Sequence, residues 1–214
     1  MTHDGIPFTP LDHVTWPLST ERLTLRRVSM TDASAMWTYR QLEEVSQWGS
    51  WRPVDQADWQ TILQRRLRDV LVIELDGQII GDLMVRVEDA WGQREVADGA
   101  RSMQAELGWA LNPSMGGQGF ATEAVREVLR LCFEDLQLHR VVAEAFAANE
   151  PSRRLAERIG MRQELYGVRD SLHRDLGWID GIGYALLADE WKHQRETAPV
   201  SRQHLGSKCR SEFG

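Results

Sequence analysis

A glycine-rich segment between a predicted strand and a predicted amphipathic helix constrains the fold more than any other part of the sequence. Residues 103–111 end in Glu-Leu-Gly-Trp-Ala-Leu and predict a strand, and residues 120–135 carry apolar side chains on one helical face. The connection, residues 112–119, holds three glycines and no Lys or Arg. Glycines let backbone N–H groups approach an anion closely, and a helix start adds unpaired N–H groups. The sequence therefore predicts a strand–turn–helix unit whose backbone can bind a phosphate.

Two familiar phosphate-binding motifs do not fit this segment. A P-loop ends in Gly-Lys-Ser/Thr, whereas Phe120 follows Gly119 here. The dinucleotide-binding fingerprint needs a further glycine at the position that Thr122 occupies. A tight strand-to-helix turn without any ligand also accounts for the glycines taken alone, so both interpretations remain open at this point.

The rest of the chain alternates strand patterns with helix patterns and contains one strand–helix–strand unit, residues 103–146. We expect a mixed α/β fold with a mostly antiparallel central sheet flanked by helices. The domain is expected over residues 21–191, after an N-terminal extension of residues 1–20 and before a polar, mobile tail of residues 192–214. The other expected elements are a strand at 22–28, helices at 31–37 and 55–68, strands at 70–75 and 79–86 joined at Asp76-Gly77, a long loop at 88–101, a strand at 140–146, a helix at 150–159 and strands at 163–169 and 181–188.

Composition argues against several classes of protein. A net charge of −7 disfavours a broad nucleic-acid surface, which needs concentrated Lys and Arg. No run of about 18 apolar residues occurs, so no membrane-spanning helix is expected. Cys132 falls on an apolar helix face and Cys209 in a polar segment, so a disulfide is not expected; with no signal peptide visible, this favours the cytoplasm. The scattered histidines lack metal-ligand spacing, and no metal is expected.

The glycine-rich segment resembles a known motif. Residues Gly116-Gly-Gln-Gly-Phe-Ala121 resemble the acetyl-CoA-binding motif Gln/Arg-x-x-Gly-x-Gly/Ala of the GNAT superfamily. Gly119 and Ala121 match the motif, whereas Gly116 stands where Gln or Arg is usual, which removes one side chain near the pyrophosphate. Four further segments resemble the family in the same order along the chain: residues 21–26, 105–113, 149–161 and 184–191.

This resemblance implies the GNAT acyl-CoA N-acyltransferase fold, with acetyl-CoA as co-substrate. It implies an N-acetyltransferase that moves acetyl to a primary amine, on a protein N-terminus or a small molecule, by direct attack in a ternary complex. The branch that it resembles includes the ribosomal-protein N-terminal acetyltransferases. The alternative is a non-catalytic acyl-CoA-binding sensor, for which the departure at Gly116 leaves room; a homodimer is compatible with either function. The residues implied in acetyl-CoA binding are Trp109, Leu111, Gly116, Gly117, Gln118, Gly119, Phe120, Ala121, Thr122, Asn149 and Ser152.

Direct acetyl transfer needs one group that accepts the amine proton and one that assists the leaving thiolate. Amines are mostly protonated at pH 7, so a general base is useful. Glu106 lies on the strand before the glycine segment, where several family members place catalytic carboxylates; the other interpretation of Glu106 is a sheet-surface glutamate with no role. In the resembled branch Asn149 and Ser152 face the pantetheine arm and thiol, so Ser152 is expected to assist the thiolate; the other interpretation is a helix-capping serine. Tyr166 and Asp170 are further candidates, as a proton donor and an acceptor-side carboxylate.

Two tryptophans predict where the acceptor binds. Trp48 and Trp51 flank Gly49-Ser50 between the first two expected helices, and in GNAT proteins this segment borders the acceptor site. Flat aromatic faces there can hold an alkyl chain, a ring or a cation, whereas ordinary loop packing is the other interpretation. The 88–101 loop is expected to help shape acceptor choice. Trp109, named above beside acetyl-CoA, is also a candidate for the core.

Overall fold

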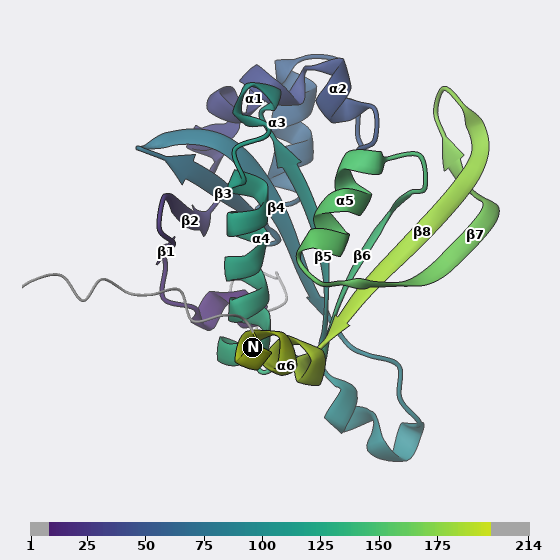
Figure 1. The fold of residues 1–214 in the computed structure, drawn as a ribbon. Helices are drawn as coiled ribbons and strands as arrows, with labels where there is room; N and C mark the ends of the chain where they lie inside the picture. The colour runs from purple at the N-terminus through teal and green to yellow at the C-terminus, as the bar shows by residue number, and fades with distance from the viewer. Residues whose placement is uncertain (1–8, 198–214) are drawn as a thin grey trace, which may run out of the picture.

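In the computed structural model, residues 9–197 are described, and their strands form one eight-stranded sheet (Figure 1). The strand order is β1-β2-β3-β4-β5-β6-β8-β7, and every neighbouring pair is antiparallel except β5 with β6. This confirms the mixed α/β fold on a mostly antiparallel sheet. The strands are β1 Leu18–Ser19, β2 Leu23–Arg27, β3 Val70–Leu75, β4 Gln78–Glu88, β5 Gln104–Leu111, β6 Arg140–Phe146, β7 Arg162–His173 and β8 Gly177–Leu187. The helices are α1 Ala33–Arg40, α2 Glu43–Ser46, α3 Gln56–Gln64, α4 Phe120–Arg130, α5 Glu150–Arg158 and α6 Ala188–Thr197.

Both faces of the sheet are covered because strand β3 is apolar on both. Alternate residues of a strand point to opposite faces. Val70 and Val72 belong to a buried cluster with α1 and α3, whereas Leu71 and Ile73 belong to a second cluster with α4. Helices α1 and α3 therefore cover one face of the sheet, and α4 covers the other.

The amphipathic helix expected at 120–135 is interrupted near its end. α4 stops at Arg130, and a π turn over Leu131–Asp135 continues the chain, with Leu136 N–H donating to Leu131 O at 2.9 Å. The wider turn lets three successive side chains, Leu131, Cys132 and Phe133, be buried together. Burial raises the pKa of the Cys132 thiol to about 12, so this cysteine is an inert core residue. Cys209 lies outside the described residues.

The ends of the domain are more ordered than the sequence predicts. In the N-terminal extension, the fully buried Leu11 belongs to the main core and β1 pairs with β2. Residues 192–197, expected in the polar tail, instead complete α6. That helix is held by Trp191, which stacks on Phe133 at 5.9 Å, and by Gln194, whose Nε2 donates to Gly160 O at 3.0 Å. Residues 1–8 and 198–214 lie outside the description.

Two further segments depart from the expected pattern. The long loop at 88–101 contains a 3₁₀ segment, Arg94–Ala100, and closes on itself where Ala90 N–H donates to Ala100 O at 2.8 Å. Strands β7 and β8 are both longer than predicted, and Figure 1 shows their hairpin extending away from the rest of the sheet. No helix within residues 9–197 is long and apolar enough to cross a membrane.

Helix α1 is joined to the sheet by a buried carboxylate on β4. Asp82, 2% exposed, accepts hydrogen bonds from Tyr39 Oη at 2.7 Å and from Arg40 Nε at 3.0 Å. The Arg40 guanidinium also lies 5.4 Å from the Trp59 ring of α3. Burial, and next the charge of Asp82, raise the pKa of Tyr39 well above its usual value, so the phenol stays a neutral donor. This cluster fixes the position of α1 and α3 over β4.

We expect Asp82→Ala to cost roughly 3–5 kcal/mol of unfolding free energy, because it leaves the Arg40 charge without its partner. Tyr39→Phe removes one hydrogen bond and should cost only about 1–2 kcal/mol. Urea unfolding of the two variants beside the wild type measures both values. A cost for Asp82→Ala no greater than that for Tyr39→Phe would show that the ion pair does not hold α1 in place.

Candidate functional site

Strands β5 and β6 part from each other soon after they begin. Only three residue pairs join them, and the last is Glu106 with Val142. Beyond that point β5 stays paired with β4 as far as Leu111, and β6 stays paired with β8 as far as Phe146. The two edges that face each other have no strand partner within residues 9–197, so their backbone N–H and C=O groups are available to a bound chain.

The glycine segment follows directly from β5. Asn112 N–H donates to Ile80 O at 2.7 Å, and a 3₁₀ turn over Pro113–Met115 then carries the chain to the start of α4. Gly117 and Gly119 have φ values of +75° and +82°, a conformation that side chains other than glycine's strongly disfavour. The first bond inside α4 runs from Glu123 N–H to Gly119 O at 3.0 Å. The helix itself therefore leaves the N–H groups of residues 120–122 unused.

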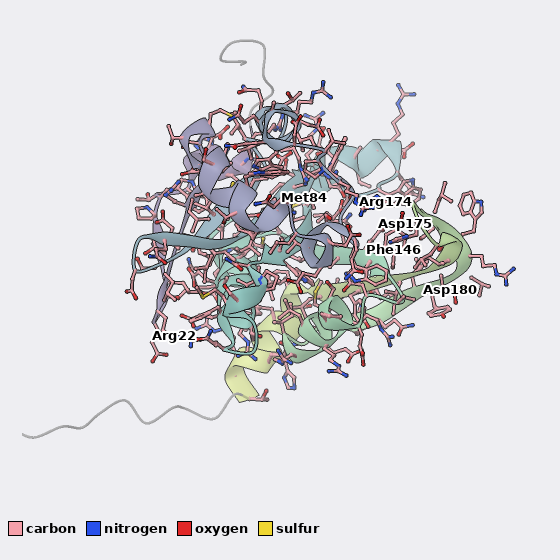
Figure 2. All side chains as sticks on the ribbon, turned by 90° about the horizontal axis from the view of Figure 1, so that it is seen from above. Arg22, Met84, Phe146, Arg174, Asp175 and Asp180 are labelled. Atoms are coloured by element: carbon pink, nitrogen blue, oxygen red, sulfur yellow. The ribbon has the colours of Figure 1, made fainter. Side chains whose placement is uncertain are left out.

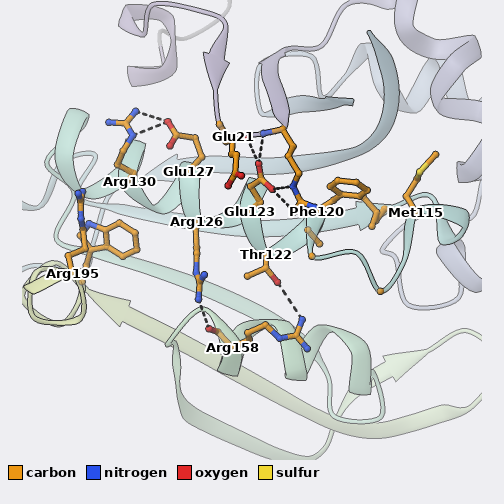
Figure 3. Close-up of a pocket in the computed structure, with 17 residues that line it drawn as sticks. Glu21, Met115, Phe120, Thr122, Glu123, Arg126, Glu127, Arg130, Arg158 and Arg195 are labelled. Carbon is orange, nitrogen blue, oxygen red and sulfur yellow. Dashed lines mark hydrogen bonds and ion pairs between the residues drawn. The ribbon is translucent and has the colours of Figure 1, made fainter. Parts of the chain in front are cut away.

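A cavity of about 850 Å³ lies beside this helix start (Figure 3). Of the residues expected to bind acetyl-CoA, six line it: Leu111, Gly117, Gly119, Phe120, Ala121 and Thr122. Gly116 does not line it, and its N–H donates to Pro113 O at 2.9 Å. Gln118 contributes its carbonyl oxygen, which accepts a hydrogen bond from Arg22 Nη1 at 3.1 Å. The glycine segment thus faces a space large enough for a ligand.

Arg22, which precedes β2, supplies the positive charge that the glycine segment lacks. Its guanidinium lies 4.5 Å from the centre of the Phe120 ring, and its Nε donates to Glu123 Oε2 at 2.7 Å. Glu123 Oε1 also accepts from Arg22 N–H at 2.9 Å and from Thr20 Oγ1 at 2.5 Å. These bonds tie the start of α4 to the N-terminal strands. Sequence reasoning missed Arg22, because nothing local to residues 112–124 indicates a contact about a hundred positions away.

Two more arginines face the same cavity without a carboxylate partner. Arg126 Nη2 donates to Arg158 O at 3.3 Å, and Arg158 Nη1 donates to Thr122 Oγ1 at 3.4 Å (Figure 3). Neither forms an ion pair with any residue in the range 9–197. Five arginines and three glutamates line the cavity, although the chain as a whole has a net charge of −7. Free N–H groups and unpaired guanidinium groups together fit a ligand with several phosphates.

A second cavity, of about 600 Å³, lies where β5 and β6 part. Six of the other residues that the sequence proposed for the site line it: Trp48, Trp51, Glu106, Trp109, Asn149 and Ser152. Tyr166 and Asp170 do not line it. The Tyr166 hydroxyl is exposed and donates to Asp180 Oδ2 at 2.6 Å, and Asp170 Oδ1 accepts from Gly181 N–H at 2.9 Å within the β7–β8 hairpin.

Ser152 lies in the first turn of α5, and its hydroxyl oxygen accepts one hydrogen bond. The side chain of Asn149 caps the helix, accepting a hydrogen bond from Ser152 N–H at 3.3 Å. Trp109 Nε1 donates to Ser152 Oγ at 3.2 Å. Because the hydroxyl oxygen accepts this bond, its own proton remains free to be donated elsewhere. Trp109 packs against the core and also lines the cavity. The core position and the position beside the ligand, both expected from the sequence, are therefore compatible.

Glu106 lies at the point of separation of the two strands. It stands opposite Arg86 of β4, and the two side chains form an ion pair, with exposed fractions of 24% for Glu106 and 50% for Arg86. The position is half-open to solvent, which leaves room for a water between Glu106 and a substrate.

The β7–β8 hairpin holds the Trp48–Trp51 segment in place. Arg174 donates to Ser46 O at 2.8 Å and to Gly49 O at 2.7 Å. The Trp48 ring meets the His173 ring edge-on at 5.4 Å, while Trp51 is 50% exposed. Figure 2 shows Arg174 and Phe146 near this hairpin and Arg22 apart from them. No metal-ligating group of three or more side chains occurs within the described residues.

Comparisons with known proteins agree on one family. The model of the acetyltransferase (GNAT) domain family matches residues 22–162. The uncharacterized N-acetyltransferase YnaD of Bacillus subtilis is 36% identical over 86 residues, which cover 40% of this chain and 50% of that protein. The chain thus spans about half the length of this curated relative. The uncharacterized N-acetyltransferase p20 of Bacillus licheniformis is 26% identical over 81% of this chain and 97% of that protein. The crystal structure of a GNAT-family acetyltransferase from Bacillus anthracis, 26% identical, covers 82% of this chain and 100% of its own, with a TM-score of 0.70.

The hydrogen bonds from Thr20 and Arg22 to Glu123 predict that the start of α4 stabilises the fold less at low pH. Burial acts to raise the pKa of Glu123, but the hydrogen bonds from Thr20 and Arg22 outweigh burial and lower it below 4.5. A depressed pKa gives stability that is present above pH 4.5 and is lost as pH falls through the folded-state value. The stability advantage of the wild type over Glu123→Gln should therefore be largest near about pH 6 and shrink by about pH 3.

Urea unfolding of both proteins at the two pH values measures this difference. Glu44→Gln, which removes an exposed carboxylate of α2, is the control and should give a difference that does not change with pH. If the difference in unfolding free energy between the wild type and Glu123→Gln is the same at both pH values, the prediction is wrong.

Proposed function

The chain belongs to the GNAT acetyltransferase family, and on that premise we propose that it transfers acetyl from acetyl-CoA to a primary amine by direct attack in a ternary complex. The observation that carries this proposal is the opening between β5 and β6, at the end of which the glycine segment begins. The cavity beside the glycine segment and the second cavity both lie next to β5. This arrangement suits a donor and an acceptor, because two molecules that react must bind side by side.

The donor fits the first cavity through its phosphates. We assign the pyrophosphate to the N–H groups of residues 117–121, and the remaining phosphate charge to Arg22, Arg126 and Arg158. The positive φ values of Gly117 and Gly119 support this assignment, because a side chain at either position would be strained. Trp109, Leu111 and Asn149 would then border the pantetheine arm, whose amides can bond to the free edges of β5 and β6.

The acceptor amine would enter by the second cavity, beside Trp48 and Trp51. In the reaction, the amine nitrogen forms a bond to the thioester carbonyl carbon and the carbon–sulfur bond breaks. The nitrogen loses a proton, for which Glu106 is the acceptor, directly or through a water. The departing thiolate receives a hydrogen bond from the Ser152 hydroxyl, whose proton is not used by Trp109, and takes up its own proton from solvent.

Gly119→Val tests the donor site. A branched side chain would project into the phosphate path, so we expect acetyl-CoA affinity measured by calorimetry to fall at least ten-fold. Gly77→Val is the matched control, because Gly77 has a φ of +78° and an added Cβ there meets nothing within 4 Å. It imposes the same backbone strain in the β3–β4 turn and should leave affinity unchanged. An unchanged affinity in folded Gly119→Val would exclude the proposed phosphate site.

A second test separates the two proton-handling groups. Glu106→Gln keeps the shape but loses the base; its kcat should fall at least about ten-fold near pH 7 and partly recover at high pH, where more amine is unprotonated. Ser152→Ala should also lower kcat, but without that recovery, because its defect lies at the leaving group. Coenzyme A release against a panel of amines and peptides measures both profiles.

Calorimetric acetyl-CoA affinity, expected to be unchanged in Glu106→Gln, is the control for that variant, and urea unfolding of both variants is the control for folding. A pH profile of Glu106→Gln that overlays the wild type would eliminate Glu106 as the base. Tight acetyl-CoA binding without coenzyme A release on any acceptor would instead identify the protein as an acyl-CoA sensor.

A further inference from the structure

The second cavity carries an uneven set of charges. Five arginines line it, Arg40, Arg65, Arg66, Arg86 and Arg153, against four carboxylates, in a chain whose net charge is negative. The arginines come from α1, from the turn after α3, from β4 and from α5. Met84 of β4, labelled in Figure 2, lines the same cavity as Arg65 and Arg66. This charge bias lies in the cavity assigned above to the acceptor, and the inference that follows rests on that assignment.

Most of the charged side chains in the cavity already have partners. Asp82 is bonded to Arg40 and Tyr39, and Glu106 is paired with Arg86. Asp69 is paired, at 3.4 Å, with Arg68, which does not line the cavity. Glu144, the fourth carboxylate, lies on β6 and is exposed to solvent. Arg153 donates to the carbonyl oxygen of Ala147 at 3.2 Å.

Arg66 differs from these residues. Its side chain is half-buried, yet its guanidinium makes no hydrogen bond and no ion pair with any residue in the range 9–197. Burial, and next the charge of Arg40, lower the pKa of Arg66, which means that the protein around it disfavours its charge. The charges of Asp82 and Asp69 act to raise the pKa of Arg66 but offset this only in part. Arg65, the exposed neighbour of Arg66, lines the same cavity and also forms no ion pair with any residue in the range 9–197.

A half-buried guanidinium that has given up part of its water without gaining a partner among residues 9–197 is stabilised by an anion, and its planar fork suits a carboxylate. We propose that Arg66, assisted by Arg65, binds an anionic group of the acceptor. The acceptor is therefore a primary amine that also carries a carboxylate. This chemistry is shared by an acidic peptide N-terminus and by a small amino acid, and the two are separated by the experiment.

Binding is measured without turnover, by calorimetry on the full chain saturated with coenzyme A. One arm compares the peptide Ser-Asp-Ala-Ala-amide with Ser-Asn-Ala-Ala-amide, and the other compares 4-aminobutanoate with 4-aminobutanamide. The wild type should bind the anionic member of at least one pair about ten-fold more tightly, as one charged hydrogen-bonded contact implies. The pair that shows the preference identifies the source of the carboxylate.

Arg66→Gln should bring that ratio close to one without loss of stability, because it removes a charge that has no partner. Arg66→Lys keeps the charge but loses the fork and should retain only part of the preference. Arg154→Gln is the control, since it removes the same charge from the exposed surface of α5, where neither Arg154 nor its partner Glu150 lines a cavity, and its ratio should equal that of the wild type. Urea unfolding of each variant confirms the fold.

Three results would overturn the proposal: no preference in the wild type, no measurable binding of either anionic ligand, or a preference that survives in Arg66→Gln. None of these depends on catalysis. Acetyl-CoA affinity and coenzyme A release are measured on the same preparations. Loss of either in the wild type would indicate that the proposed acetyltransferase function itself is wrong. If the wild type binds the anionic and the neutral ligand equally well but still releases coenzyme A, the anion site is excluded and the proposed function is not.

Discussion

The separation of β5 and β6 after three paired residues is the constraint on which the rest of the site depends. Two parallel neighbours that stayed paired would satisfy each other's backbone groups and leave no space between them. Here each strand is held on its outer side by an antiparallel partner, so the sheet stays intact while its centre opens. Glu106 lies at the apex of that opening, and Trp109 and Ser152 meet across it. The helices that cover both faces of the sheet keep these positions fixed.

The start of α4 shows how distant parts of the chain combine into one binding surface. The glycines supply the backbone conformation, but Arg22 and Thr20 from the turn between β1 and β2 hold Glu123, and Arg158 of α5 reaches Thr122. The result is a positively charged cavity on an acidic protein. The β7–β8 hairpin acts in the same way at the other cavity, where Arg174 fixes the backbone that carries Trp48. Both cavities are thus set by long-range contacts.

Local patterns in the sequence were enough to predict the fold class and the strand–turn–helix unit. Glycine at positions 117 and 119 signals positive φ, and the apolar face of 120–135 signals a helix, because both are properties of neighbouring residues. The π turn, the buried Leu11 and the six residues that complete α6 were not predictable, since each depends on packing against distant elements. Arg22 and Arg66 were not predicted as site residues for the same reason, because their surroundings depend on contacts between distant parts of the chain.

A crystal structure of the protein with coenzyme A tests the central claim most directly, because it locates the donor relative to the opening between the strands. The account predicts the pyrophosphate on the N–H groups of residues 117–121, the pantetheine arm between β5 and β6, and the sulfur nearest to the Ser152 hydroxyl. Coenzyme A bound with its pantetheine arm outside that opening, or with its phosphates away from the start of α4, would contradict it.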